Sequence, residues 1–108
     1  MKLIVDVSRV SFMVSREVAP RMDQTANVQR RDKVTGLPMW TVQLVAMDEG
    51  GAEVINVTVV APEAPKLSVG QPVVPVSLEA IPWAQNGKNG VAFRAAELKP
   101  AVMGKAAA

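Results

Sequence analysis

The chain has 108 residues, the size of one domain, and its 49% hydrophobic and 20% charged residues are typical of a globular protein. It contains no cysteine, histidine or tyrosine. Disulfide scaffolds, Cys/His metal sites, cysteine nucleophiles and His-based triads are therefore excluded. We expect a protein that is not an enzyme and that needs no cofactor or metal ion.

The charge is distributed unevenly along the chain. The formal net charge of +2 divides into +3 in residues 1–40, −4 in residues 41–80 and +3 in residues 81–108. Basic ends that meet on one face would suit a polyanion, although ordinary mixed surface charge gives the same pattern. The sequence has no apolar leader and no apolar run long enough to cross a bilayer, so we expect a cytoplasmic protein without a membrane partner.

Alternation of apolar and polar residues predicts a long first strand over residues 2–14. The alternation slips once, between Val7 and Val10, which is typical of a β-bulge that bends the strand. A long, bent first strand is what a small closed barrel requires. The same alternation predicts that Phe12 lies in the core.

Residues 15–38 are polar and basic, and Pro20 interrupts any alternation. They predict a long excursion that protrudes as a hairpin or wing between the first two strands. Long polar loops are uncommon in small domains and tend to carry function. The excursion contains a cluster of cations: Arg16, Arg21, Arg30, Arg31 and Lys33.

Four further strands are predicted, over residues 39–47, 53–60, 72–81 and 91–99. Pro72 and Pro75 indicate that part of the fourth strand is an edge. Residues 82–90 form a loop whose two Asn-Gly pairs are strong hairpin signals. Five bent strands without a long helix favour a small antiparallel barrel over a sandwich, which needs about seven strands. We expect one domain over residues 1–101 and a flexible tail over residues 102–108.

Three stretches, 36–50, 54–59 and 67–101, resemble the oligonucleotide/oligosaccharide-binding (OB) barrel of single-stranded DNA-binding proteins, particularly the filamentous-phage gene V type. The chain is also similar in overall texture to small regulatory proteins of actinobacterial (Streptomyces) integrative and conjugative elements. The resemblance implies an all-β fold: a five-stranded OB-like antiparallel barrel with a long basic excursion after its first strand and no long helix. It also implies a symmetric homodimer with a basic groove on each subunit, and binding of single-stranded DNA with little sequence preference. That activity would serve the replication or transfer of a plasmid, phage or integrative element.

A single-strand binder needs cations that follow the phosphates and flat side chains that stack on the bases. Trp83 lies beside the Asn-Gly loop and could stack on a base, although it could instead cap the core or fill a dimer interface. Trp40 shares the alternation of Val42 and Leu44, which favours the core, and Phe93 is also expected there. The predicted binding residues are Arg16, Arg21, Arg30, Arg31, Lys33, Trp40, Trp83, Lys88 and Arg94.

Two other functions fit the sequence. An exposed edge of the fourth strand and the Trp83 loop could dock the protein, as an accessory factor, on a replication or conjugation enzyme. A transcriptional regulator of a mobile element is the other alternative, and the absence of a recognition helix weakens it.

Overall fold

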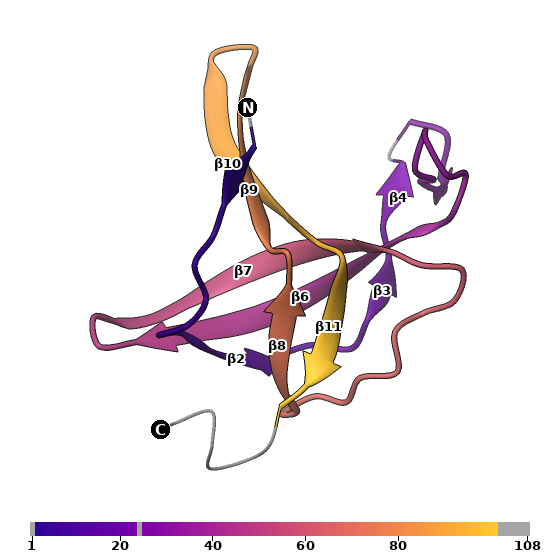
Figure 1. Ribbon diagram of the computed structural model, residues 1–108. Helices are drawn as coiled ribbons and strands as arrows, with labels where there is room; N and C mark the ends of the chain where they lie inside the picture. Colours follow the sequence, from indigo (N-terminus) through magenta and orange to yellow (C-terminus); the bar gives the residue numbers. More distant parts are fainter. Residues whose placement is uncertain (1, 24, 102–108) are drawn as a thin grey trace.

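A computed structural model describes residues 2–23 and 25–101, and in this range every regular element is a β-strand (Figure 1). The prediction of an all-β protein without a long helix is confirmed for these residues. Accordingly, the described part of the chain offers no helix with the length and apolarity needed to traverse a bilayer. The predicted flexible tail, 102–108, lies outside the described residues.

Two long strands form the centre of the sheet: β6 (Met39–Asp48) and β7 (Gly51–Val60). They pair antiparallel over their whole length, from Met39 opposite Val60 to Asp48 opposite Gly51. Both are rich in β-branched residues, which favour strands. They agree closely with the strands predicted over 39–47 and 53–60.

The predicted first strand, 2–14, is instead two short strands: β1 (Leu3–Ile4) and β2 (Ser11–Val14). Between them the chain leaves the sheet, and the Ser8 N–H donates to the Asp6 carboxylate at 3.0 Å. The prediction of one bulged strand is therefore wrong. The slip in the alternation marks a break in the strand. At this break the Asp6 carboxylate accepts a backbone N–H that would otherwise bond to a neighbouring strand.

The predicted fourth and fifth strands are each broken once. The fourth divides at Ser77, which has a φ of 54°, into β8 (Pro72–Val76) and β9 (Glu79–Gln85). The fifth divides at Ala96 into β10 (Lys88–Ala95) and β11 (Glu97–Pro100). The two breaks are adjacent, because the Ala96 N–H donates to the Val76 carbonyl at 2.9 Å. Continuous strands over 72–81 and 91–99 were thus wrong predictions.

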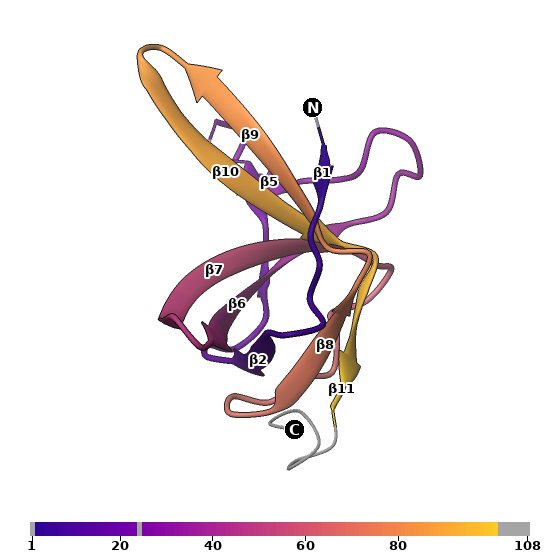
Figure 2. The ribbon, with the colours of Figure 1, turned by 60° about the vertical axis from the view of Figure 1, so that its left-hand side comes forward.

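β9 and β10 continue past the predicted strand ends and form a hairpin that projects from the rest of the molecule (Figures 1 and 2). Asn86 and Gly87, with φ angles of 54° and 76°, form its two-residue turn. Positive φ at both positions is what a type I′ turn requires. The predicted loop over 82–90 is therefore mostly strand, and of its two Asn-Gly pairs only the first makes a turn.

The main sheet has the strand order β1-β9-β10-β7-β6-β2-β8-β11 and curls strongly (Figure 2). β7 and β10 pair in parallel, whereas the other pairs are antiparallel. The broken fourth and fifth strands form one bent hairpin, with β8 and β11 in one half and β9 and β10 in the other. β2 lies between β6 and β8, so the curl brings the β8–β11 half against the first part of the chain.

The curled sheet surrounds one apolar core. Phe12 is 4% exposed, which confirms its predicted core position, and Phe93 is partly buried against the same cluster. The alternation of buried residues shifts at both strand breaks, so that Val73 and Leu78 both face the core. The cluster consists of Phe12, Val14, Val42, Leu44, Ile55, Val57, Val59, Val73, Leu78, Ala95 and Leu98.

The excursion after β2 contains two projections rather than one wing. β3 (Ala19–Pro20) pairs with β6, and β4 (Met22–Asp23) and β5 (Val28–Gln29) form a separate two-stranded sheet. The second projection is a turn over residues 32–36, in which the Gly36 N–H donates to the Asp32 carbonyl at 2.8 Å. Short local hydrogen bonds thus replace the long hairpin that a single wing would need.

We predict that Leu44→Ala lowers the free energy of unfolding by about 2–5 kcal/mol, because a fully buried leucine leaves a cavity when truncated. Val54→Ala, on the neighbouring strand but 58% exposed, should change it by less than about 1 kcal/mol. Urea denaturation of both variants measures the difference. Equal effects of the two substitutions would contradict the placement of the core.

Candidate nucleic-acid interface

A polar row crosses the outer face of the sheet. Thr58 of β7 lies opposite Thr41 of β6 on one side and Arg94 of β10 on the other. Directly paired residues point to the same side of a sheet, so these three side chains share a face. It is the face opposite the buried Val57 and Val59. Gln43 and Asn56, also paired, extend this polar surface along β6 and β7.

Arg21 reaches this row from the excursion. Its Nη1 donates to the Thr58 hydroxyl at 3.0 Å, and its carbonyl accepts the Arg30 N–H at 2.7 Å. Partial burial, and then the positive charge of Arg30, lowers the pKa of Arg21. In the described range the ion pairs are Arg94–Asp32 and Lys99–Glu97, so neither Arg21 nor Arg30 has an acidic partner there. Two neighbouring, unneutralised guanidinium groups favour the binding of an anion.

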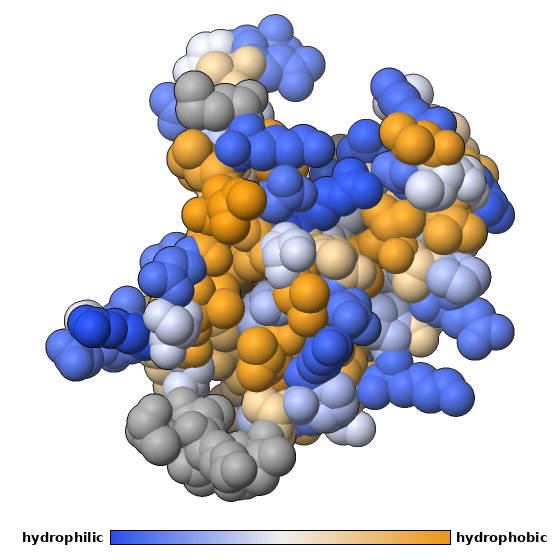
Figure 3. All heavy atoms as spheres, viewed as in Figure 1, coloured by the Kyte–Doolittle hydropathy of each residue, from blue (hydrophilic) through white to orange (hydrophobic). Residues whose placement is uncertain are grey.

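A groove runs over this face, and we call it the outer groove. Its larger part, about 830 Å³, lies between the β4–β5 hairpin and the tip of the β9–β10 hairpin. A second part, about 540 Å³, extends past Thr41 to Arg16. Figure 3 shows the hollow between the β4–β5 hairpin and the β9–β10 hairpin, with hydrophilic residues at its base. The residues lining the larger part are Pro20, Arg21, Met22, Asp23, Thr25, Arg30, Thr41 and Gln85.

One face of the β9–β10 hairpin turns toward the outer groove. Trp83 pairs with Gly90, and Gln85 pairs with Lys88. Alternation places these residues on the same side of the hairpin as Arg94, which belongs to the polar row. Gln85 lines the groove, so Trp83 and Lys88 lie on the face of the hairpin that adjoins it.

The Trp83 indole lies across the backbone of Gly90. A Cβ atom at position 90 would stand 2.8 Å from Cζ2 of the indole and 3.1 Å from its Nε1. Any side chain there would displace the ring. Trp83 is nevertheless 46% exposed, so part of its ring remains open for stacking. A nucleobase could stack on the exposed part of the Trp83 ring.

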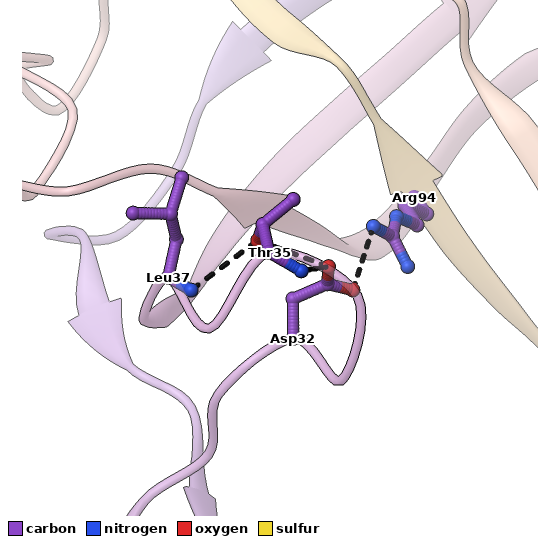
Figure 4. A network of polar contacts seen from close by, with 4 residues as sticks. All are labelled: Asp32, Thr35, Leu37 and Arg94. Atoms are coloured by element: carbon purple, nitrogen blue, oxygen red, sulfur yellow. Dashed lines mark hydrogen bonds and ion pairs between the residues drawn. The ribbon is translucent and has the colours of Figure 1, made fainter.

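An ion pair fastens the 32–36 turn beside the groove (Figure 4). Arg94 Nη2 lies 3.2 Å from Asp32 Oδ1, and Asp32 Oδ2 accepts the N–H and the hydroxyl of Thr35, each at 3.0 Å. The hydrogen bonds from Thr35, with a smaller contribution from Arg94, lower the pKa of Asp32, whereas burial opposes them. Arg94 therefore positions the excursion as well as contributing charge.

Three predicted binding residues lie away from the outer groove. Trp40 is half-buried on the same side of the sheet as Val42, and its indole N–H donates to the Ala61 carbonyl at 2.9 Å. Arg31 donates to the Gly36 carbonyl at 2.9 Å, and Lys33 is exposed on the same turn. Of the other predicted residues, Arg16, Arg21 and Arg30 line the groove, and Trp83, Lys88 and Arg94 share the face of the hairpin on which Gln85 lines it.

The sequence prediction missed Thr41, which lines the groove, and Thr58 and Gly90, which belong to the adjoining surfaces. Thr41 and Thr58 occupy the outward positions of alternating strands, which is the signal that could have identified them. Gly90 belongs to an Asn-Gly pair, which in the sequence indicates only a turn.

The chain matches no family model, no curated protein and no solved structure. Any functional proposal therefore rests on this geometry. Within the described ranges, no group of His, Cys, Asp or Glu side chains is arranged to hold a metal ion.

We predict that Asp32→Asn lowers the free energy of unfolding near neutral pH by removing a carboxylate that is better stabilised in the folded protein. The folded-state pKa lies below the unfolded value of 3.8, so the stabilisation is present above that value and is lost as the pH falls through the folded-state pKa. Urea denaturation at several pH values should show the difference between wild type and variant shrinking below about pH 4. A difference that stays constant with pH would contradict this role, and Glu63→Gln is the control.

Proposed function

We propose that the protein binds single-stranded DNA in the outer groove, with low sequence specificity. The observation that carries this proposal is that Trp83 and Lys88 share one face of the hairpin with Gln85, which lines the same groove as Arg21 and Arg30. Cations and an open aromatic ring on one surface are the combination that single-stranded DNA requires. The protein would act by binding alone, without a cofactor.

The order of strand pairing supports an OB-type barrel as the finer description of the fold. If each broken strand is counted as one, the main sheet has five ribbons in chain order: β1 joined with β2, then β6, then β7, then β8 joined with β9, and last β10 joined with β11. The first ribbon pairs with the second and the fourth, and the third pairs in parallel with the fifth. In OB folds the oligonucleotide lies on strands two and three, between the loops that follow strands one and four. The outer groove occupies the corresponding place.

The groove would hold the DNA strand by two kinds of contact. Phosphates would lie against Arg16, Arg21, Arg30 and Lys88, releasing condensed counterions into solution. A base would stack on the open part of the Trp83 ring, and every base has a face suitable for this. Neither contact reads base edges, which accounts for the low sequence specificity.

The biological setting and the assembly are proposed from the resemblance. We propose that binding serves the replication or transfer of a plasmid, phage or integrative element in the cytoplasm, as a homodimer that can meet a replication or conjugation protein. Leu3 and Ile4, which are 49% and 85% exposed, supply apolar surface of the kind that subunit contacts use.

We predict that oligo(dT) quenches tryptophan fluorescence and that a duplex of equal length does not. With about three or four phosphates bound, log affinity should fall with log salt at a slope of about −2 to −3. Titration at two salt concentrations measures both. Affinity that is independent of salt would contradict the mechanism. Preference for one duplex sequence would favour a transcriptional regulator, and no response to either nucleic acid would favour an accessory factor.

We predict that Trp83→Ala weakens oligo(dT) binding by about 1–3 kcal/mol, the usual contribution of one stacked base. Gly90→Ala should weaken it in the same direction, because the new Cβ would displace the indole. Val91→Ala is the matched control, since Val91 lies on the opposite face of the same hairpin and is 51% exposed. Fluorescence anisotropy of labelled oligo(dT) gives the affinities, and equal losses in all three variants would contradict stacking on Trp83.

A further inference from the structure

Half of β7 has a free backbone edge. β7 pairs with β6 over its whole length but with β10 only through Val57, Thr58 and Val59. β10 leaves β7 at this point, and the two strands diverge as the hairpin projects (Figure 2). In the described chain, no strand pairs with the outer edge of residues 51–56. A free edge of this kind is a template on which a further strand can add.

A cavity of about 460 Å³ with both apolar and acidic lining residues opens beside this edge, on the inner side of the curled sheet. Ile55 and Phe93 also line a smaller hollow, of about 400 Å³, in the gap between β7 and β10, where Val54 and Val91 are exposed. The free edge therefore has apolar space next to it. The large apolar side chains that line the larger cavity are Val5, Val10, Phe12, Ile55, Leu78 and Phe93.

Charge restricts what can occupy this place. Asp48 and Glu53 line the larger cavity, and Glu53 also lines the smaller one, whereas no lysine or arginine lines either. Glu49 is exposed in the adjoining turn. A second copy of the chain added at this edge would bring these carboxylates against their own counterparts, which is unfavourable. A cationic segment would be attracted.

We propose that the free edge of β7 docks an extended segment of another protein that carries both apolar residues and lysine or arginine at every second position, on one face. The segment would add as a strand to residues 51–56, with main-chain hydrogen bonds supplying affinity. Glu53 and Ile55 lie on the same side of β7, so this one face of the segment would bring its apolar side chains into the cavity and its basic groups against Asp48 and Glu53. This site lies apart from the outer groove, so the protein could hold DNA and a partner protein together.

The test uses amide hydrogen exchange of the whole protein, followed by NMR, with the acetylated peptide Lys-Ser-Val-Ser-Lys-Ser-Val, which carries lysine and valine on one face, as probe. The expected result is slower exchange at amides within residues 51–56 and shifted signals of Ile55 and Phe93. The matched acidic peptide Glu-Ser-Val-Ser-Glu-Ser-Val should have no such effect. Absence of protection with the basic peptide, or equal protection by both peptides, would overturn the proposal. Protection that rises with protein concentration alone would also overturn it, since the occupant would then be a second copy.

A charge reversal provides the matched comparison. Glu53→Lys should weaken binding of the basic peptide about three- to tenfold, the effect expected of an exposed charge pair that is lost. Glu63→Lys makes the same change of charge on an exposed position of the 61–71 connection and should leave binding unchanged. Equal weakening by both would reduce the effect to overall charge and overturn the proposal. Oligo(dT) added to the same samples should not displace the peptide. Loss of DNA binding with peptide binding intact would overturn the proposed function alone.

Discussion

The paired breaks at Ser77 and Ala96 are the constraint on which the rest of the structure depends. They divide one antiparallel hairpin into two halves that point in different directions. In the half formed by β8 and β11, β8 pairs with β2 and closes the curl around the core. In the half formed by β9 and β10, β10 pairs with β7, and the hairpin then projects beyond it. The Ala96 N–H bonded to the Val76 carbonyl keeps the two breaks adjacent, so the hairpin bends as a unit.

The same bend generates both surfaces discussed above. One face of the projecting hairpin carries Trp83, Lys88 and Gln85, and Gln85 lines the outer groove. On the other face, the divergence of β10 leaves the edge of β7 without a partner strand. Arg94 stands at the junction, where its ion pair with Asp32 ties the excursion to the hairpin. Three arginines and two carboxylates, Glu17 and Asp23, line the groove, whereas the cavities at the free edge are lined by carboxylates without lysine or arginine. This difference suits the two surfaces to different ligands.

The sequence predicted the features that depend on local pattern. Alternation identified β6 and β7 and the inward position of Phe12, because a half-buried strand must alternate. The strand breaks were not foreseen, since Ser77 adopts a positive φ that its residue type does not announce and only tertiary pairing stabilises. The same limit applies to the site: the cations and Trp83 were found by residue type, whereas Thr58 and Gly90 depend on which strands become neighbours. Trp40, by contrast, followed its alternation and lies on the side of the sheet away from the groove.

The most direct measurement is an NMR map of the backbone amides that shift when oligo(dT) is added. If the outer groove holds the DNA strand, the largest shifts will fall on its floor and walls, at Thr41, Thr58, Gln85 and Gly90. The far side of the hairpin and the free edge of β7, represented by Val91 and Val54, will change little. Shifts concentrated at Val54 and Val91, or the absence of any shift at saturating oligo(dT), would contradict the account.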